Sequence, residues 1–333
     1  MGLEARRIIL KSKGLKLGYK KQGEETVVAE DIAFELKKGA LTCLLGPNGV
    51  GKSTLIKTIM GQLPVLQGTV FLEGKPLENF PQKELSKKIA VVLTDKVSLG
   101  NVTVYQLVSL GRIPHTTWLG SMSGLDHAKV EKAIEVTQIA YLKDKVLSEL
   151  SDGQLQKVMI ARALAQDGEI LILDEPTAHL DLINRFEIMH LLREIAQKEQ
   201  KAVLVVTHDL DIAIETADEF WLMQCGLPLV CGSPEDLIVS NKINLLLPND
   251  SLKFDLLTGK VQESKAYDYP KILGEEKLVR WLKLVIRKNK LVFPKDLVHI
   301  SIAESPFLIS LMLEKEPLEF TTFESFLRYF LSN

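Results

Sequence analysis

The chain opens with an apolar-rich segment at 8–19, and apolar and polar positions alternate in a second segment at 27–36. In the second segment Ile32, Phe34 and Leu36 share one face, so both segments predict strands. Continuous apolar runs, with amphipathic helical patterns between them, follow later: runs at 41–45, 89–93, 170–173, 202–206 and 220–223, and helical patterns at 55–60, 186–196 and 210–217. Short apolar strands alternating with helices predict a parallel sheet that is covered on both faces.

The segment 102–150 has a different, helical period, seen for example in Val130 and Ile134, and Gly-containing breaks divide it. Ahead of this segment, an apolar run at 69–72 followed by a Glu-Gly pair predicts a hairpin. The pattern therefore predicts a mixed sheet in the first part of the chain and a helical insertion into an α/β domain.

The pattern changes again after about residue 231, and 254–261 predicts another hairpin. The tail that follows contains an amphipathic helix (Leu278, Trp281, Leu282 and Val285), an alternating strand at 298–302, an apolar run at 307–313 and a last helix opened by the capping-box pattern Thr321-x-x-Glu324. These elements predict a large domain at 1–262 and a small α/β domain at 263–333.

Composition limits the function classes. The chain has 333 residues and is 46% hydrophobic, which is enough for two packed cores. Its formal net charge of -2 provides no basic field, so we do not expect a nucleic acid partner. We expect a protein that is neither secreted nor membrane-spanning, because no leader pattern and no run of about 18 apolar residues occurs. The three cysteines, Cys43, Cys225 and Cys231, have no metal-site spacing, so we interpret them as buried structural thiols.

The strongest motif is the glycine-rich segment after the run at 41–45. It matches G-x-x-x-x-G-K-[ST] and consists of Gly46, Pro47, Asn48, Gly49, Val50, Gly51, Lys52, Ser53 and Thr54. A strand precedes it and a helix follows, so its backbone N–H groups and the helix N-terminus favour an anion. We expect the loop to bind phosphates, Lys52 to add a positive charge, and the Ser53 hydroxyl to ligate Mg²⁺.

Two acids follow a later buried strand. Asp174 and Glu175 come directly after the run at 170–173, at the strand end where open α/β sheets bind ligands. We expect Asp174 to help hold Mg²⁺ and Glu175 to polarise an attacking water.

Three further motifs narrow the family: Leu150-Ser151-Asp152-Gly153-Gln154, Ala178-His179-Leu180-Asp181 and Thr207-His208-Asp209. With the phosphate loop and the acid pair, they stand in the order and spacing of the ATP-binding subunit of an ABC transporter, which the segment from about 8 to 234 resembles. Below, Leu150–Gln154 is called the signature segment, Ala178–Asp181 the D-loop and Thr207–Asp209 the histidine turn.

The resemblance implies an α/β P-loop NTPase fold with a parallel sheet core, an antiparallel β subdomain and a helical subdomain at about 100–165. It also implies a role for each motif. Tyr19 would stack on the adenine of ATP, and His208 would reach the γ phosphate and hold Glu175. The signature segment, including Ser151 and Gly153, would contact the nucleotide of a second copy of the chain. Asp181 would lie at the interface between the two copies. The signature segment also predicts a helix start that Ser151 or Asp152 caps.

The chain departs from the family pattern at two places. Thr94 and Asp95 stand where the family usually has a Gln that contacts Mg²⁺ and the membrane partner. We expect altered coupling and retained hydrolysis. Asp152 replaces a usual Gly, and we expect its carboxylate to cap the helix and so to avoid the triphosphate.

The segments 101–107 and 110–115 resemble the importers of iron-siderophore complexes, haem or cobalamin. This resemblance implies transmembrane permease subunits docked in a groove around Thr94, Tyr105, Arg112 and His115, although these residues also fit ordinary helix packing. It further implies a substrate-binding protein as an indirect partner and a peripheral location at the cytoplasmic face of the inner membrane of a bacterium. Two alternatives remain: a soluble ABC-type ATPase for iron-sulfur assembly, translation or repair, and a nucleotide-binding regulator that does not hydrolyse ATP.

Overall fold

The computed structural model describes residues 6–21, 23–93, 101–116, 121–247, 251–256, 258–264, 267–314 and 316–331. The chain divides into two compact units, Met1–Gln262 and Glu263–Asn333. Within the described ranges, no helix has both the length and the apolar character needed to cross a membrane.

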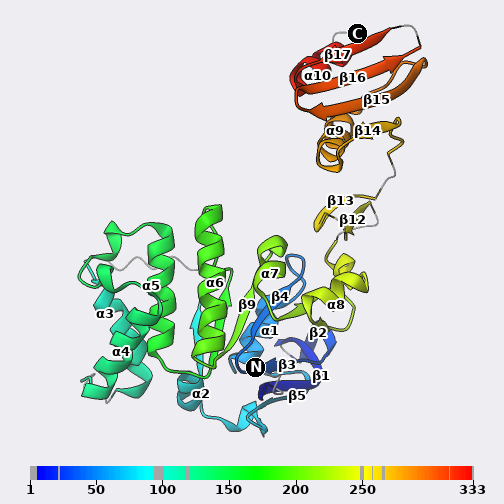
Figure 1. Ribbon diagram of the computed structural model, residues 1–333. Helices are drawn as coiled ribbons and strands as arrows, with labels where there is room; N and C mark the ends of the chain where they lie inside the picture. Colours follow the sequence, from blue (N-terminus) through cyan, green and yellow to red (C-terminus); the bar gives the residue numbers. More distant parts are fainter. Residues whose placement is uncertain are drawn as a thin grey trace. The chain divides into compact units, whose positions relative to one another are not determined.

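A six-stranded sheet forms the centre of the first unit (Figure 1). Its strands, in spatial order, are β11 (Val230–Gly232), β10 (Glu219–Leu222), β4 (Leu41–Leu45), β9 (Ala202–Val206), β8 (Ile170–Asp174) and β7 (Ile89–Val92). All neighbouring pairs are parallel except β10 and β11. Buried side chains form one core on each face of the sheet, as the continuous apolar runs predict.

An antiparallel sheet accompanies it, made of β1 (Ile8–Lys21), β2 (Glu24–Ile32), β3 (Glu35–Lys37), β5 (Gln67–Leu72) and β6 (Lys75–Pro76). The predicted strand at 27–36 is in fact two strands, both paired with β1. Ala33 and Phe34 separate the two strands, and just before them Asp31, within β2, has a φ of 55° beside a register shift in the pairing with β1. Ile32 and Leu36 are nevertheless both buried.

Helices cover the sheets. They are α1 (Lys52–Ile59), α2 (Gln82–Lys88), α3 (Val104–Ser109), α4 (Gly124–Val136), α5 (Asp152–Ala165), α6 (Leu182–Lys198), α7 (Leu210–Thr216) and α8 (Pro234–Val239), with 3-10 turns η1 (Leu77–Asn79), η2 (Leu110–His115), η3 (Ala140–Leu142), η4 (Leu147–Glu149) and η5 (Lys242–Leu246). In Figure 1, α3, α4 and α5 form a group beside α6. This group is the predicted helical subdomain. A small hairpin of β12 (Leu252–Asp255) and β13 (Lys260–Glu263) follows η5.

The second unit is a four-stranded sheet with two helices. Its strands, in spatial order, are β14 (Ile272–Gly274), β15 (Leu297–Glu304), β16 (Phe307–Leu313) and β17 (Pro317–Phe320), and its helices are α9 (Glu276–Asn289) and α10 (Phe323–Leu331). Leu282 and Ile286 of α9 and Phe326 of α10 belong to its core. Two details of the prediction are wrong. Trp281 is 60% exposed, and Thr322, one residue after the predicted Thr321, caps α10 by accepting a hydrogen bond from the Ser325 N–H.

The prediction of three buried thiols is wrong for one cysteine. Cys43 lies in β4 and burial raises the pKa of its thiol. Burial also raises the pKa of Cys231 to about 12. Cys225, however, is exposed, because it lies in the turn after β10.

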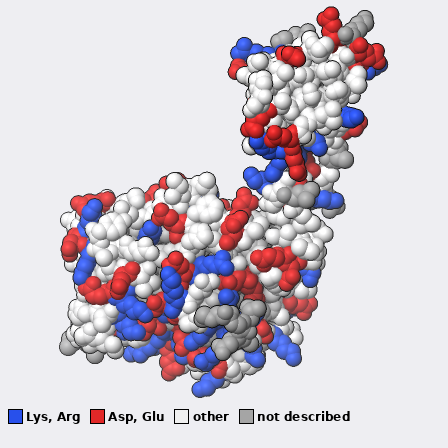
Figure 2. All heavy atoms as spheres, viewed as in Figure 1, with Lys and Arg blue, Asp and Glu red and all other residues white. Residues whose placement is uncertain are grey.

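Positive and negative side chains are interspersed over the visible face of the first unit in Figure 2.

Candidate nucleotide site

The phosphate loop connects β4 to α1 at the carboxyl edge of the central sheet. Its glycines are required by geometry: φ is 80° at Gly49 and 113° at Gly51, where residues with a Cβ are strained. At Gly46 a Cβ would lie 2.4 Å from the carbonyl oxygen of Met223. The chain can therefore turn sharply here and open the N-terminus of α1 toward solvent.

The Lys52 side chain folds back over this loop. Its Nζ donates to the carbonyl oxygens of Gly46, at 2.6 Å, and of Pro47, at 3.0 Å. Burial lowers the pKa of Lys52, while the nearby carboxylates of Glu175 and Asp174 act in the opposite direction. The predicted cation and the two predicted acids are thus close enough to influence one another's charge.

The residues after Lys52 provide oxygen atoms. Ser53 is exposed in the first turn of α1. The Thr54 hydroxyl lies 3.1 Å from the Tyr19 hydroxyl of β1, and the Tyr19 side chain is 44% exposed. This contact places Tyr19 beside the phosphate loop and leaves much of its ring accessible.

The donor set fits Mg²⁺. Ser53 and Asp174 offer hard oxygen ligands at the same sheet edge, which is the chemistry that this ion prefers. Among the described residues, no group of three or more His, Cys, Asp or Glu side chains is arranged to hold a metal. An ion held by one or two protein oxygens together with phosphates, as is usual for Mg²⁺, is consistent with both observations.

Glu175 adopts a strained backbone conformation directly after β8. Its φ is 49°, and its N–H donates to the Val206 carbonyl at 2.9 Å. The Glu175 Oε2 atom lies 2.8 Å from Nδ1 of His208, in the histidine turn after β9. Neighbouring parallel strands thus bring the predicted acid and the predicted histidine into contact.

The D-loop ends at the start of α6. Asp181 is the N-cap of this helix, and its carboxylate accepts hydrogen bonds from the N–H and the side-chain amide of Asn184, both at 2.8 Å. These bonds hold the pKa of Asp181 below its usual range. Asp181 and the next residues, Leu182 and Ile183, are exposed.

The signature segment forms the start of α5. Ser151 is its N-cap and makes reciprocal hydrogen bonds with Gln154. The expectation that Asp152 caps the helix is therefore wrong: Asp152 is the first residue of α5, exposed, where a carboxylate is favoured by the helix dipole. Gly153 is buried against α6, because a Cβ there would lie 2.5 Å from the Oδ1 atom of Asn184.

The predicted partner groove is only partly accessible. Thr94 and Asp95 lie outside the described residues. Arg112 is 4% exposed, with its Nε atom 2.8 Å from Asp126 and its Nη1 atom donating to the Ala165 carbonyl. The predicted docking role of Arg112 is wrong, because its guanidinium is buried in the helical subdomain and is hydrogen-bonded there. His115 is half-buried against the Gln166 carbonyl, and the Tyr105 hydroxyl contacts His127.

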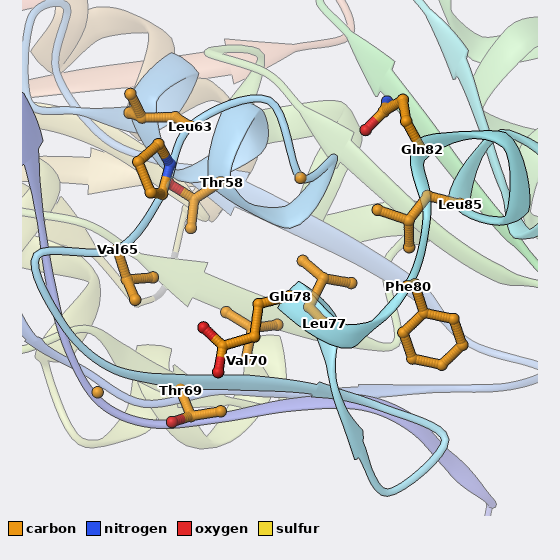
Figure 3. A pocket seen from close by; sticks show the side chains of 13 residues that line it. Thr58, Leu63, Val65, Thr69, Val70, Leu77, Glu78, Phe80, Gln82 and Leu85 are labelled. Carbon is orange, nitrogen blue, oxygen red and sulfur yellow. The ribbon is translucent and has the colours of Figure 1, made fainter.

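A separate hollow of about 260 Å³ lies at the other end of α1. Figure 3 shows it among the last turn of α1 (Thr58), the following loop (Val65), β5 (Val70), η1 (Leu77) and α2 (Leu85). None of the predicted nucleotide residues lines this hollow. α1 therefore has the phosphate loop at one end and a largely apolar hollow at the other.

Two residues of the site, Thr177 and Arg185, were missed by the sequence analysis, and both contact Asp209 of the histidine turn. Asp209 accepts a hydrogen bond from Thr177 at 2.8 Å and lies 3.4 Å from Arg185 of α6. The position of Arg185 could have indicated this contact from the sequence. A positive charge in the first turn of a helix is disfavoured by the helix dipole, so it is expected to pair with an acidic side chain.

Two family models match the chain. The model described as ABC transporter matches residues 29–178. A model described as AAA domain, putative AbiEii toxin, Type IV TA system, matches residues 143–215. The first match spans the phosphate loop, the signature segment and the acid pair.

The chain is also similar to individual proteins. An uncharacterised ABC transporter ATP-binding protein of Methanocaldococcus jannaschii is 39% identical over 238 residues, 72% of this chain and 81% of that protein. The iron(3+)-hydroxamate import ATP-binding protein FhuC of Bacillus subtilis is 37% identical over 271 residues, 81% of this chain and 98% of that protein. A solved inward-facing putative metal-chelate type ABC transporter is 26% identical with a TM-score of 0.61, and the match covers 72% of this chain and 89% of that one. The chain therefore belongs to the family of ABC transporter ATP-binding proteins.

Proposed function

We propose that the chain is the ATP-hydrolysing subunit of an importer that takes up an iron complex (siderophore or haem) or cobalamin through a membrane permease. Members of the family are ATPases. The observation that carries hydrolysis is the contact between Glu175 and His208, at the sheet edge that also holds Lys52. The name of the Bacillus subtilis relative supports the class of cargo.

Each residue of the site has a separate role in this proposal. Lys52 exchanges its two loop carbonyls for the β and γ phosphates of ATP, with Tyr19 beside the adenine. Ser53 and Asp174 would hold Mg²⁺, which supplies charge neutralisation to the phosphates. Glu175 accepts a hydrogen bond from the attacking water and orients it in line with the γ phosphorus. His208 holds the Glu175 carboxylate in place and reaches the γ phosphate.

A second copy of the chain completes the site in this proposal. Ser151 and Gly153 of one copy would approach the γ phosphate on the other, and Asp181 would lie between the copies. Two apolar residues that follow Asp181 support an interface here, because Leu182 is 65% and Ile183 is 72% exposed. An isolated monomer would then bind ATP and hydrolyse it poorly.

The permease would dock on the helical subdomain, with the chain peripheral at the cytoplasmic face of the membrane and the substrate-binding protein an indirect partner. Within η2, Leu110 is 44% and Ile113 is 62% exposed, on either side of the buried Arg112. Exposed apolar residues that are held in place by a buried neighbour, here Arg112, can pack against a helix of a partner protein. These two residues replace Arg112 in the docking face that we propose.

Phosphate release from Mg-ATP tests the enzymatic part. We expect release by the wild-type chain and a loss of about 100-fold or more in Glu175→Gln, the usual range for a general base, with ATP binding retained. Equal release by both proteins would contradict the role of Glu175.

Co-purification tests the transport part. Ile113→Asp should reduce recovery of a membrane permease with the chain and leave ATP binding unchanged, with Leu125→Asp, also exposed on the subdomain, as the matched control. Repeated recovery of soluble partners alone would favour the soluble ABC-type ATPase instead.

A further inference from the structure

The side chain of Arg185 contacts two segments of the proposed site at once. It lies in the first turn of α6, and its Nε atom donates to the Leu180 carbonyl of the D-loop at 2.8 Å. Its Nη1 atom lies 3.4 Å from Oδ1 of Asp209, in the histidine turn. A guanidinium presents its donors in a fixed fork, so this contact fixes the distance between the two segments.

Asp209 is itself firmly held. Its other carboxylate oxygen accepts a hydrogen bond from the Thr177 hydroxyl at 2.8 Å, and its N–H donates to the Thr207 hydroxyl at 3.0 Å. Both threonines are 1% exposed. Because Asp209 follows His208 directly, whatever holds Asp209 also sets the direction from which His208 approaches Glu175.

The last residue of the same D-loop is linked through Asn184 to the signature helix, α5. Asp181, one residue after Leu180, is bonded twice to Asn184, and Asn184 fills the space beside Gly153. A continuous series of contacts therefore runs from Glu175 and His208 through Asp209 and Arg185 to the D-loop, and from there to the start of α5.

We propose that Arg185 is a positioning residue for ATP hydrolysis, which holds the histidine turn in register with the D-loop. This inference rests on the proposed function, because His208 acts on the γ phosphate only there. Arg185 touches neither Lys52 nor the loop that receives the nucleotide in the contacts above. Its loss should therefore lower kcat and leave the affinity for ATP unchanged.

The chain offers a matched control in the same helix. Arg193 has the same side-chain exposure as Arg185, 37%, and also contacts one backbone carbonyl, of Glu215, and one carboxylate, of Asp218. Asp218 does not belong to the proposed site. Arg193→Gln therefore removes an equivalent surface contact without touching the histidine turn.

The experiment compares Arg185→Gln, Arg185→Lys, Asp209→Asn, the Arg185→Gln/Asp209→Asn double variant and Arg193→Gln in the full chain. We expect Arg185→Gln to lower kcat about tenfold, as loss of one charge-assisted contact implies, with the ATP Kd unchanged. Asp209→Asn should resemble it, and the double variant should be no slower than the slower single variant, because both remove the same contact. Arg185→Lys should restore only part of the rate, since an ammonium cannot bond both segments with fork geometry.

A kcat of Arg185→Gln equal to that of Arg193→Gln would overturn the inference, and so would additive losses in the double variant or a loss confined to ATP affinity. If Arg185→Gln fails to fold, the kcat and ATP Kd of Asp209→Asn and Arg185→Lys are compared with those of Arg193→Gln instead. A wild-type chain that hydrolyses ATP in a Glu175-dependent manner while the Arg185 variants match the control would refute this inference and leave the proposed function standing. A wild-type chain without hydrolysis would refute the proposed function first.

Discussion

The phosphate loop and the start of the signature helix are both helix N-termini, yet they are built in opposite ways. At α1, two glycines have positive φ, no side chain caps the helix, and Lys52 is buried on its own loop. At α5, Ser151 and Gln154 satisfy the helix start with their own side chains, and Ser151 and Asp152 are exposed. A terminus with uncapped N–H groups can bind a ligand directly, whereas a capped terminus is stable on the surface until a partner binds.

The largest expected effect is at the first terminus. Lys52→Ala should weaken ATP binding about 10- to 100-fold, because a charge-assisted hydrogen bond contributes about 1.5–3 kcal/mol. Titration with a fluorescent ATP analogue measures it, with the exposed Lys57→Ala of the same helix as control. Equal affinities would show that the loop does not bind the nucleotide.

A smaller effect is expected at the second terminus. Gly153→Ala places a Cβ 2.5 Å from Asn184 Oδ1 and should displace it from Asp181, lowering kcat about tenfold without weakening ATP binding by the monomer. Alanine favours a helix, which offsets part of the cost of displacing Asn184, so the change in stability should be small.

Adding Asn184→Ala removes the clash but also the hydrogen bond from the Asn184 side-chain amide to Asp181, while the bond from the Asn184 backbone N–H remains possible. A double variant as slow as Gly153→Ala alone would indicate that Asn184 acts by holding Asp181, whereas recovery of the rate would contradict this role. Loss of ATP binding in Gly153→Ala would erase the distinction between the two termini.

Alkaline pH should act on the first terminus alone. Burial lowers the pKa of Lys52, and the charged form binds phosphates, so affinity is complete below this pKa and declines as pH rises through it. The decline should begin below the usual lysine value of about 10.4. Lys52→Arg should bind less pH-dependently, because a guanidinium stays charged. A wild-type affinity that is constant up to that value would contradict the lowered pKa.

The smallest effect is expected at Tyr19. Tyr19→Phe removes the contact with Thr54, which is partly exposed and replaceable by water, so the ATP Kd should change by less than about twofold. Tyr19→Ala removes the ring and should weaken binding by up to about tenfold if the ring stacks on adenine. Indistinguishable affinities of these two variants would exclude stacking.

The sequence predicts the fold class well, because the hydrophobic periodicity and the positions of the turn residues determine it. Buried parallel strands read as continuous apolar runs, and the glycines of the phosphate loop are required by backbone geometry. The α/β class and the family are confirmed. The predictions that fail depend on contacts that are distant in sequence or on local backbone angles, such as the interruption between β2 and β3 at Ala33 and Phe34.

Arg112 illustrates the limit. From the sequence, Arg112 is expected to be a surface residue. In the structure it is buried, because it forms an ion pair with Asp126, fourteen positions away. Arg185 shows the reverse case, since its partners Leu180 and Asp209 come together only when α6 packs near the histidine turn. Side chains whose partners lie on other elements cannot be assigned from spacing alone.

The left-handed backbone at Glu175 has a consequence for how this protein can change. A residue held at φ 49° costs about 1 kcal/mol or more unless it is Gly or Asn, so the fold would be more stable with either of them at this position. Random change followed by selection for thermal resistance should therefore repeatedly replace this glutamate, and each replacement would remove the acid. Stability and turnover are opposed at this residue, and only selection for hydrolysis keeps the carboxylate there.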